Sequence, residues 1–217
     1  MDADALQWPH TNFVMSVAQL AQFPALGMPS VAVAGHSNVG KSSLLNALFG
    51  RKGLVKTSKN PGCTRLLNLF AVDERLLVVD LPGYGFARAS KGEQARWGAL
   101  ISSYLRSASA PKRVLMLLDI RHGPKPHDLQ LISWLDAAAI RWIPVATKAD
   151  KLSGNQRGAR LREMTAVLGS GRVPLPTSAS KGMGIRELRT MVQQEVLAEH
   201  SDESAHGSDV WNSCTTR

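Results

Sequence analysis

The segment from Gly35 to Ser42 has the residue types and spacing of a phosphate-binding loop. Its sequence fits G-x-x-x-x-G-K-[ST], with an apolar run before it and a helical pattern after it. In such a loop, backbone amides and the following helix N-terminus point at phosphate oxygens. Lys41 can reach the terminal phosphates, and the Ser42 hydroxyl can ligate Mg²⁺. We therefore predict a nucleoside triphosphate site lined by Gly35, His36, Ser37, Asn38, Val39, Gly40, Lys41 and Ser42.

A second group of residues is suited to the metal and the terminal phosphate. Asp80 ends an apolar run, where it can hold Mg²⁺ through water, and Gly83 lets a backbone amide approach the γ-phosphate. Thr64 lies in a polar loop that could close on Mg²⁺ when the γ-phosphate is present, although most loop threonines have no such role. The predicted metal set is Ser42, Thr64 and Asp80. The further predicted nucleotide contacts are Gly62, Cys63, Thr64, Arg65, Leu66, Asp80, Leu81, Pro82 and Gly83.

Two later segments are suited to reading a guanine base. In Thr147-Lys148-Ala149-Asp150, the Asp150 carboxylate can accept hydrogen bonds from guanine N1–H and N2–H₂, and adenine lacks both donors. Such a site can discriminate by about 10⁴-fold, because ATP would leave the carboxylate unpaired. The stem of Lys148 can lie over the base plane. Backbone amides of Ser178-Ala179-Ser180, with the basic Lys181, can face guanine O6, and Thr177 is a further predicted nucleotide contact. The predicted ligands are therefore GTP and GDP.

The residue that would position the attacking water is missing from its usual place. Ras-like enzymes use Gln directly after Asp-x-x-Gly, whereas Tyr84 stands there in this chain. This favours slow intrinsic turnover with a group supplied by a partner, and it leaves Lys41, Thr64 and Gly83 as the predicted catalytic contacts. An alternative uses Asn38 as a K⁺ ligand near the phosphates, although Asn in such a loop can also hydrogen-bond the backbone.

Alternating strands and helices must position these segments. Apolar runs at 31–34, 66–72, 76–79, 114–118, 142–146 and 173–176 predict six strands, with a hairpin turn at Asp73-Glu74. Helices are expected over 43–49, 92–105, 128–138, 155–168 and 184–199. The pattern predicts an α/β fold, a three-layer sandwich around a mostly parallel six-stranded sheet with one antiparallel strand. With the phosphate loop and the guanine-reading segment, this sandwich resembles the phosphate-loop GTPases of the Ras-like type. Ligands bind beyond the carboxyl ends of such strands, where the motifs fall.

The chain is strongly basic, with a net charge of +9. Five basic residues and no acidic one lie between Arg51 and Leu66, and six basic residues accompany Glu93 alone between Tyr84 and Arg113. Both clusters flank the predicted nucleotide-sensing loops. They favour a polyanionic partner such as RNA, the alternative being a solvated basic surface with no partner.

Other features limit the setting of the chain. The two cysteines, Cys63 and Cys214, form no disulfide framework, and no run of 18 apolar residues occurs. We therefore expect a cytoplasmic monomer with no membrane insertion. Residues 1–28 are expected to form an extension packing on the domain, 29–199 the GTP-binding domain, and 200–217 a disordered tail.

The order of the motifs resembles that of the TRAFAC-class GTPases, and the detail resembles the EngB (YihA/YsxC) family. The resemblance runs from Phe13 to Leu197 and is carried by segments 35–46, 57–64, 80–87, 119–124 and 147–151. It implies a GTPase with a role in maturing the large ribosomal subunit, whose loss disturbs cell division and septation. The basic residues beside both nucleotide-sensing loops would then bind rRNA phosphates. Three residues depart from the family pattern: His36 and Cys63 where basic residues are usual, and Arg65 where Gln is common.

Two other function classes remain as alternatives. One is a GTP-dependent interaction module at the division septum with no direct ribosomal role. The other is an ATP-using phosphate-loop kinase, which Asp150 and the lack of a lid segment disfavour.

Overall fold

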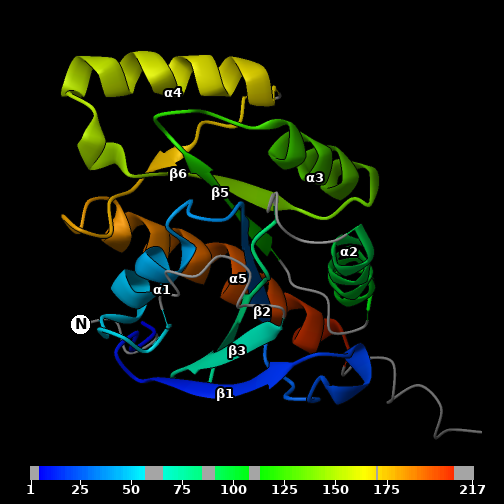
Figure 1. Cartoon of the computed structure of the whole chain (residues 1–217). Coiled ribbons are helices and arrows are strands. Elements are labelled where there is room, and N and C mark those ends of the chain that lie inside the picture. The colour runs from blue at the N-terminus through cyan, green and yellow to red at the C-terminus, as the bar shows by residue number, and fades with distance from the viewer. Residues whose placement is uncertain (1–4, 57–65, 85–90, 108–112, 170, 208–217) are drawn as a thin grey trace, which may run out of the picture.

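The structure is a computed structural model that describes residues 5–56, 66–84, 91–107, 113–169 and 171–207 of the 217-residue chain. It is an α/β sandwich with one mixed sheet between two layers of helices (Figure 1). The strands are β1 (Thr11–Val17), β2 (Ser30–Gly35), β3 (Leu67–Val72), β4 (Leu76–Asp80), β5 (Arg113–Asp119), β6 (Trp142–Thr147) and β7 (Leu175–Pro176). The helices are α1 (Lys41–Phe49), α2 (Lys91–Leu105), α3 (Pro126–Ala137), α4 (Gly154–Leu168) and α5 (Ile185–Gly207), with 3-10 turns at Leu20–Gln22 and Ala149–Lys151.

The sheet order is β1-β3-β4-β2-β5-β6-β7. Strands β4, β2, β5, β6 and β7 pair in parallel, and β3 runs antiparallel to both β4 and β1. The β3–β4 turn occurs at Asp73 and Glu74, as expected, and both have a φ of 52°. Two consecutive positive φ values match the twist of a tight hairpin.

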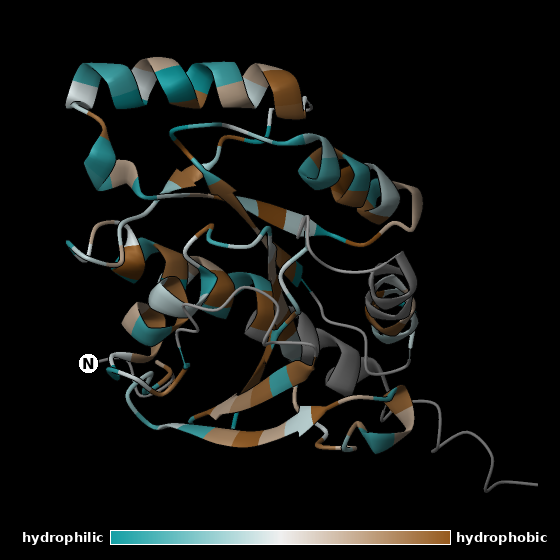
Figure 2. Cartoon of the chain, viewed as in Figure 1, coloured by the Kyte–Doolittle hydropathy of each residue, from teal (hydrophilic) through white to brown (hydrophobic). Residues whose placement is uncertain are grey.

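Burial explains why the central strands are continuous apolar runs. Every residue of β2 is buried, with Val31 and Val33 facing the core under α1 and α5, and Ala32 and Ala34 facing the core under α2, α3 and α4. A strand covered on both faces needs apolar side chains at every position. In Figure 2 these strands are largely brown, whereas α4 carries many hydrophilic residues.

The fold class is confirmed, with seven strands in place of the expected six. The added strand is β1, which lies in the segment expected only to pack on the domain and pairs with β3 from Thr11↔Val72 to Val17↔Leu67. Only its two end residues are buried, so the alternation that predicts a strand is weak there.

Helix α5 also continues further than predicted, to Gly207 rather than residue 199. The segment from 201 to 207 contains the helix formers Glu203 and Ala205, which favour continuation of the helix. The expectation for residues 208–217 lies outside the described residues. Among the helices that the structure describes, none has the length and apolar character needed to cross a membrane.

Candidate functional site

The phosphate loop joins the buried strand β2 to helix α1. Asn38 and Gly40 have φ values of 64° and 108°, and Gly40 is the N-cap whose carbonyl accepts the Leu44 amide at 2.8 Å. A Cβ on Gly35 would lie 2.8 Å from Val39 Cγ1, so only glycine fits there without rearrangement. The loop therefore bends tightly and leads directly into a helix N-terminus, as phosphate binding requires.

Residues at the end of β6 hydrogen-bond to the phosphate loop and hold it in place. The Thr147 hydroxyl is buried and donates to the carbonyls of Val39 at 2.7 Å and Leu118 at 3.2 Å. The Lys148 ammonium donates to the Asn38 carbonyl at 2.6 Å and to Asp119 Oδ2 at 2.9 Å. The base-reading segment and the phosphate loop are thus fixed to one another.

Asp119, the last residue of β5, holds Lys148 in position. Burial raises the pKa of its carboxyl, but hydrogen bonds from Arg121 and Lys148 outweigh burial and hold that pKa well below its usual range. Arg121 donates through its backbone amide at 3.0 Å and through its guanidinium at 2.9 and 2.7 Å. The ionised carboxylate therefore keeps the Lys148 ammonium beside the phosphate loop.

The metal end of the site contains a buried ion pair. Lys41, the first residue of α1, forms a hydrogen-bonded ion pair with Asp80 Oδ1 at the end of β4. The Asp80 side chain is only 2% exposed, and its other oxygen lies 3.5 Å from Asn68 Nδ2. The predicted phosphate-binding cation and the predicted metal-binding carboxylate therefore lie together.

The residues after Asp80 run alongside the start of the phosphate loop. The Ser37 amide donates to the Tyr84 carbonyl at 3.0 Å, and His36 and Tyr84 form an isolated parallel bridge. A Cβ on Gly83 would lie 3.1 Å from Ser37 Oγ, so this glycine permits close packing of the two segments. This contact places the Gly83 backbone against the loop that it was predicted to assist.

The base-reading end is formed by Asp150 and the segment after β7. Ser178 donates to Asp150 Oδ1 at 2.7 Å and lies 3.1 Å from Ser180 Oγ, and Lys151 Nζ is 3.4 Å from Asp150 Oδ2. The Ser178 hydrogen bond is the main cause that lowers the pKa of Asp150. The carboxylate is therefore ionised and oriented, as an acceptor for guanine requires.

The structure brings the predicted residues of both ends to the carboxyl edge of the sheet, although it gives some of them another role. Thr147 and Thr177 are buried, and their hydroxyls donate to backbone carbonyls. Three other predicted contacts are also buried: Leu81, Pro82 and Ala149. Leu66 and Ala179 are half-buried, and Ser180 is exposed. Gly62, Cys63, Thr64 and Arg65 lie outside the described residues.

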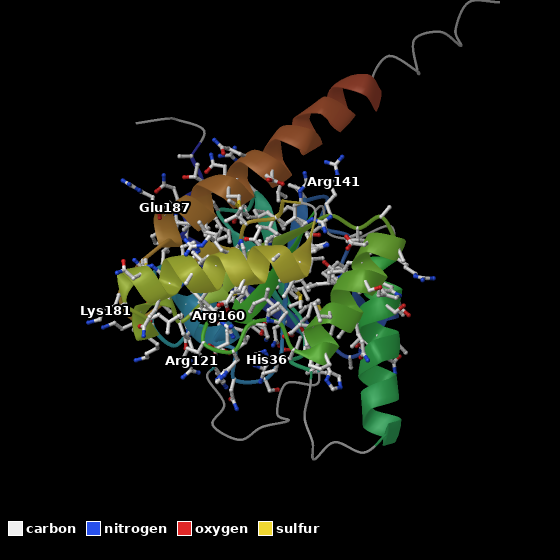
Figure 3. All side chains as sticks on the ribbon, turned by 90° about the horizontal axis from the view of Figure 1, so that it is seen from above. His36, Arg121, Arg141, Arg160, Lys181 and Glu187 are labelled. Carbon is white, nitrogen blue, oxygen red and sulfur yellow. The ribbon has the colours of Figure 1, made fainter. Side chains whose placement is uncertain are left out.

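Sequence reasoning missed Asp119 and Asp128 as parts of the site. Asp119 ends the buried run of β5 just as Asp80 ends that of β4, so its position was a usable signal. Asp128 lies in the first turn of α3, and no motif marks it. Figure 3 shows His36 at the same edge of the molecule as Arg121, the residue whose guanidinium bonds to Asp119.

This sheet order, with a phosphate loop at one strand end and a guanine-type carboxylate at another, defines a phosphate-loop GTP-binding protein. A family model described as "50S ribosome-binding GTPase" matches residues 30–148. The chain belongs to the EngB family of GTP-binding proteins. It is 50% identical over 160 residues to "Probable GTP-binding protein EngB" of Desulfotalea psychrophila, covering 74% of this chain and 81% of that protein. It is 43% identical over 208 residues to the protein of the same description from Syntrophotalea carbinolica, covering 94% and 98%.

Solved structures agree with this assignment. A crystal structure of a probable GTP-binding protein engB superposes with a TM-score of 0.61 at 25% identity, over 78% of this chain and 99% of that one. Era from Aquifex aeolicus bound to GDP and AlF₄⁻ superposes with a TM-score of 0.64 at 23% identity, over 78% and 57%, and supports the fold alone.

Proposed function

We propose that this chain hydrolyses GTP to GDP and phosphate slowly and with Mg²⁺, and that it acts as a nucleotide-gated switch in the assembly of the large ribosomal subunit, on which normal division and septation depend. The observation that carries the proposal is the connection between the two ends of the site. Lys148 belongs to the base-reading segment, and its ammonium donates to the Asn38 carbonyl of the phosphate loop. A guanine base and its phosphates would therefore be read by one rigid unit.

The residues at the metal end fit Mg²⁺. The Ser42 hydroxyl, in the first turn of α1, and the buried Asp80 carboxylate are oxygen donors of the kind that this hard cation prefers. We expect Ser42 to bind directly, Asp80 through water, and Thr64 to complete the set. When bound, Mg²⁺ would neutralise charge on the β- and γ-phosphates, while Lys41 and the Gly83 amide contact the same oxygens.

The Tyr84 side chain supports a low intrinsic rate. Its hydroxyl donates to Asp128 at 2.7 Å, toward α3, so this side chain is engaged where Ras-like enzymes have their water-orienting Gln. Hydrolysis would then depend on a group from a partner or on an additional cation.

Asn38 is our candidate ligand for such a cation, K⁺. It is exposed, and among the described residues its side-chain amide has no hydrogen-bond partner, while its carbonyl accepts from Lys148. We expect turnover to be several-fold faster in KCl than in NaCl, and Asn38→Ala to remove the difference. Equal rates of the parent protein in the two salts would contradict this role.

A ribosomal partner is tested by co-sedimentation. With a non-hydrolysable GTP analogue we expect binding to large ribosomal subunits, and with GDP we expect much less. Raising salt from 50 to 200 mM should weaken binding by about ten-fold or more if two or more phosphates are contacted, because released counterions drive such association. Equal or absent binding in both nucleotide states would instead favour the septum module, and strong competition by ATP for the nucleotide site would contradict the guanine assignment.

A further inference from the structure

A buried carboxylate outside the predicted site connects helix α3 to the phosphate loop. Asp128 is 0% exposed, and its two oxygens have different partners. Oδ1 accepts the Tyr84 hydroxyl at 2.7 Å, and Oδ2 accepts the backbone amide of Lys125, the residue before the helix, at 2.8 Å. A buried carboxylate is costly unless such bonds are made, so the Tyr84 contact is a substantial one.

Tyr84 transmits this contact to the residues that would face the γ-phosphate. Its carbonyl accepts the Ser37 amide, and the preceding residue, Gly83, packs against the Ser37 side chain. Burial, together with the neighbouring Asp128, raises the pKa of Tyr84 far above its usual value, so the hydroxyl keeps its proton and stays a donor. The chain of contacts from α3 through Tyr84 to the phosphate loop is therefore continuous.

His36 leaves the Asp128 carboxylate available to Tyr84 at neutral pH. Its Nδ1 lies 4.0 Å from Asp128 Oδ1 and, within the described part of the chain, has no hydrogen-bond partner. The charged groups facing it are Asp128 in α3, Lys125 just before α3, Asp119 at the end of β5 and Lys148 just after β6. Burial lowers the pKa of His36 more than Asp128 raises it, so the imidazole is neutral and does not draw the carboxylate away.

We propose that Asp128 is a positioning residue that, through the Tyr84 hydroxyl, holds the Gly83 amide against the phosphate loop and thereby favours GTP over GDP. The inference rests on the proposed contact between Gly83 and the γ-phosphate. GDP has no phosphate at that position, so it gains nothing from a fixed Gly83. Fixing a binding group in advance lowers the cost of ordering it when the ligand arrives, and here only GTP benefits.

The test measures nucleotide discrimination rather than turnover. We expect Tyr84→Phe, which deletes only the hydroxyl, to weaken binding of a non-hydrolysable GTP analogue by about ten-fold and binding of GDP by less than two-fold. The matched control is Tyr104→Phe. It makes the same change at the chain's other tyrosine, a buried residue of α2 whose hydroxyl lies 3.5 Å from Ser30 Oγ. We expect this control to leave the affinity ratio unchanged.

A double-mutant cycle identifies Asp128 as the partner. Asp128→Ala should lower the affinity ratio as Tyr84→Phe does, and the double variant should lose no more than either single variant, because both remove one contact. If Asp128→Ala does not fold, the comparison between the two tyrosine variants still decides. Equal losses for both nucleotides, or an unchanged ratio, would overturn the proposal. Neither readout involves hydrolysis or ribosomes, so those parts of the proposed function stand or fall separately.

Discussion

Replacing Asp150 by asparagine is expected to reduce GTP affinity by about 10³- to 10⁴-fold and to give a site that prefers xanthine nucleotides. The ionised carboxylate, oriented by Ser178, accepts from guanine N1–H and N2–H₂. An amide has one acceptor and one donor group, so it would meet the guanine amino group with a donor. Xanthine carries a carbonyl there, which the amide can satisfy while its oxygen accepts from N1–H.

Competition against a fluorescent guanine nucleotide measures this change. GTP, XTP and ATP would be titrated into the parent protein and Asp150→Asn. The control is Asp136→Asn, which makes the same chemical change on α3, outside the site, at a carboxylate that accepts a hydrogen bond from Trp142 Nε1 of β6. Undiminished GTP affinity in Asp150→Asn would show that another residue reads the base.

The parts of the site that the sequence predicts are those in which local spacing determines geometry. The phosphate loop needs only a strand, a bend and a helix in succession, and Gly40, with a φ of 108°, lies in that bend. Asp80 ends the buried strand β4 and Asp150 comes shortly after the buried strand β6, and parallel strands bring their carboxyl ends to one edge. These residues were found because the fold class converts sequence order into position.

The parts that the sequence did not predict depend on contacts between distant segments. Tyr84 and Asp128 are 44 residues apart, and their bond requires α3 to begin beside the end of β4, which no periodicity specifies. Strand β1 was missed for a related reason. Its middle residues are mostly exposed, so its place at the sheet edge is set by backbone pairing with β3 rather than by a burial pattern. Lys148 was predicted to cover the base. Its ammonium also donates to the Asn38 carbonyl and to Asp119, so it holds the phosphate loop against the end of β5.

Lys41→Met is expected to lower GTP hydrolysis by at least about 10²-fold, because it removes a cation that would stabilise charge developing on the phosphates. It should also destabilise the fold. Lys41 and Asp80 side chains are 10% and 2% exposed, and loss of one partner leaves a buried charge unpaired, at a cost of about 3–5 kcal/mol. Denaturant unfolding and steady-state phosphate release measure the two effects.

A second substitution tests whether the loss of hydrolysis in Lys41→Met follows from its loss of stability. Lys41→Met combined with Asp80→Asn removes the unpaired charge, so we expect the double variant to regain a large part of the lost unfolding free energy while hydrolysis stays low. Arg162→Met, which removes an exposed cation on α4, is the control and should change neither quantity. Recovery of hydrolysis together with stability would mean that Lys41 acts only through the fold. Recovery of stability alone would show that lost stability does not cause the loss of hydrolysis, which then reflects the missing Lys41 cation or the missing Asp80 carboxylate that we propose for Mg²⁺.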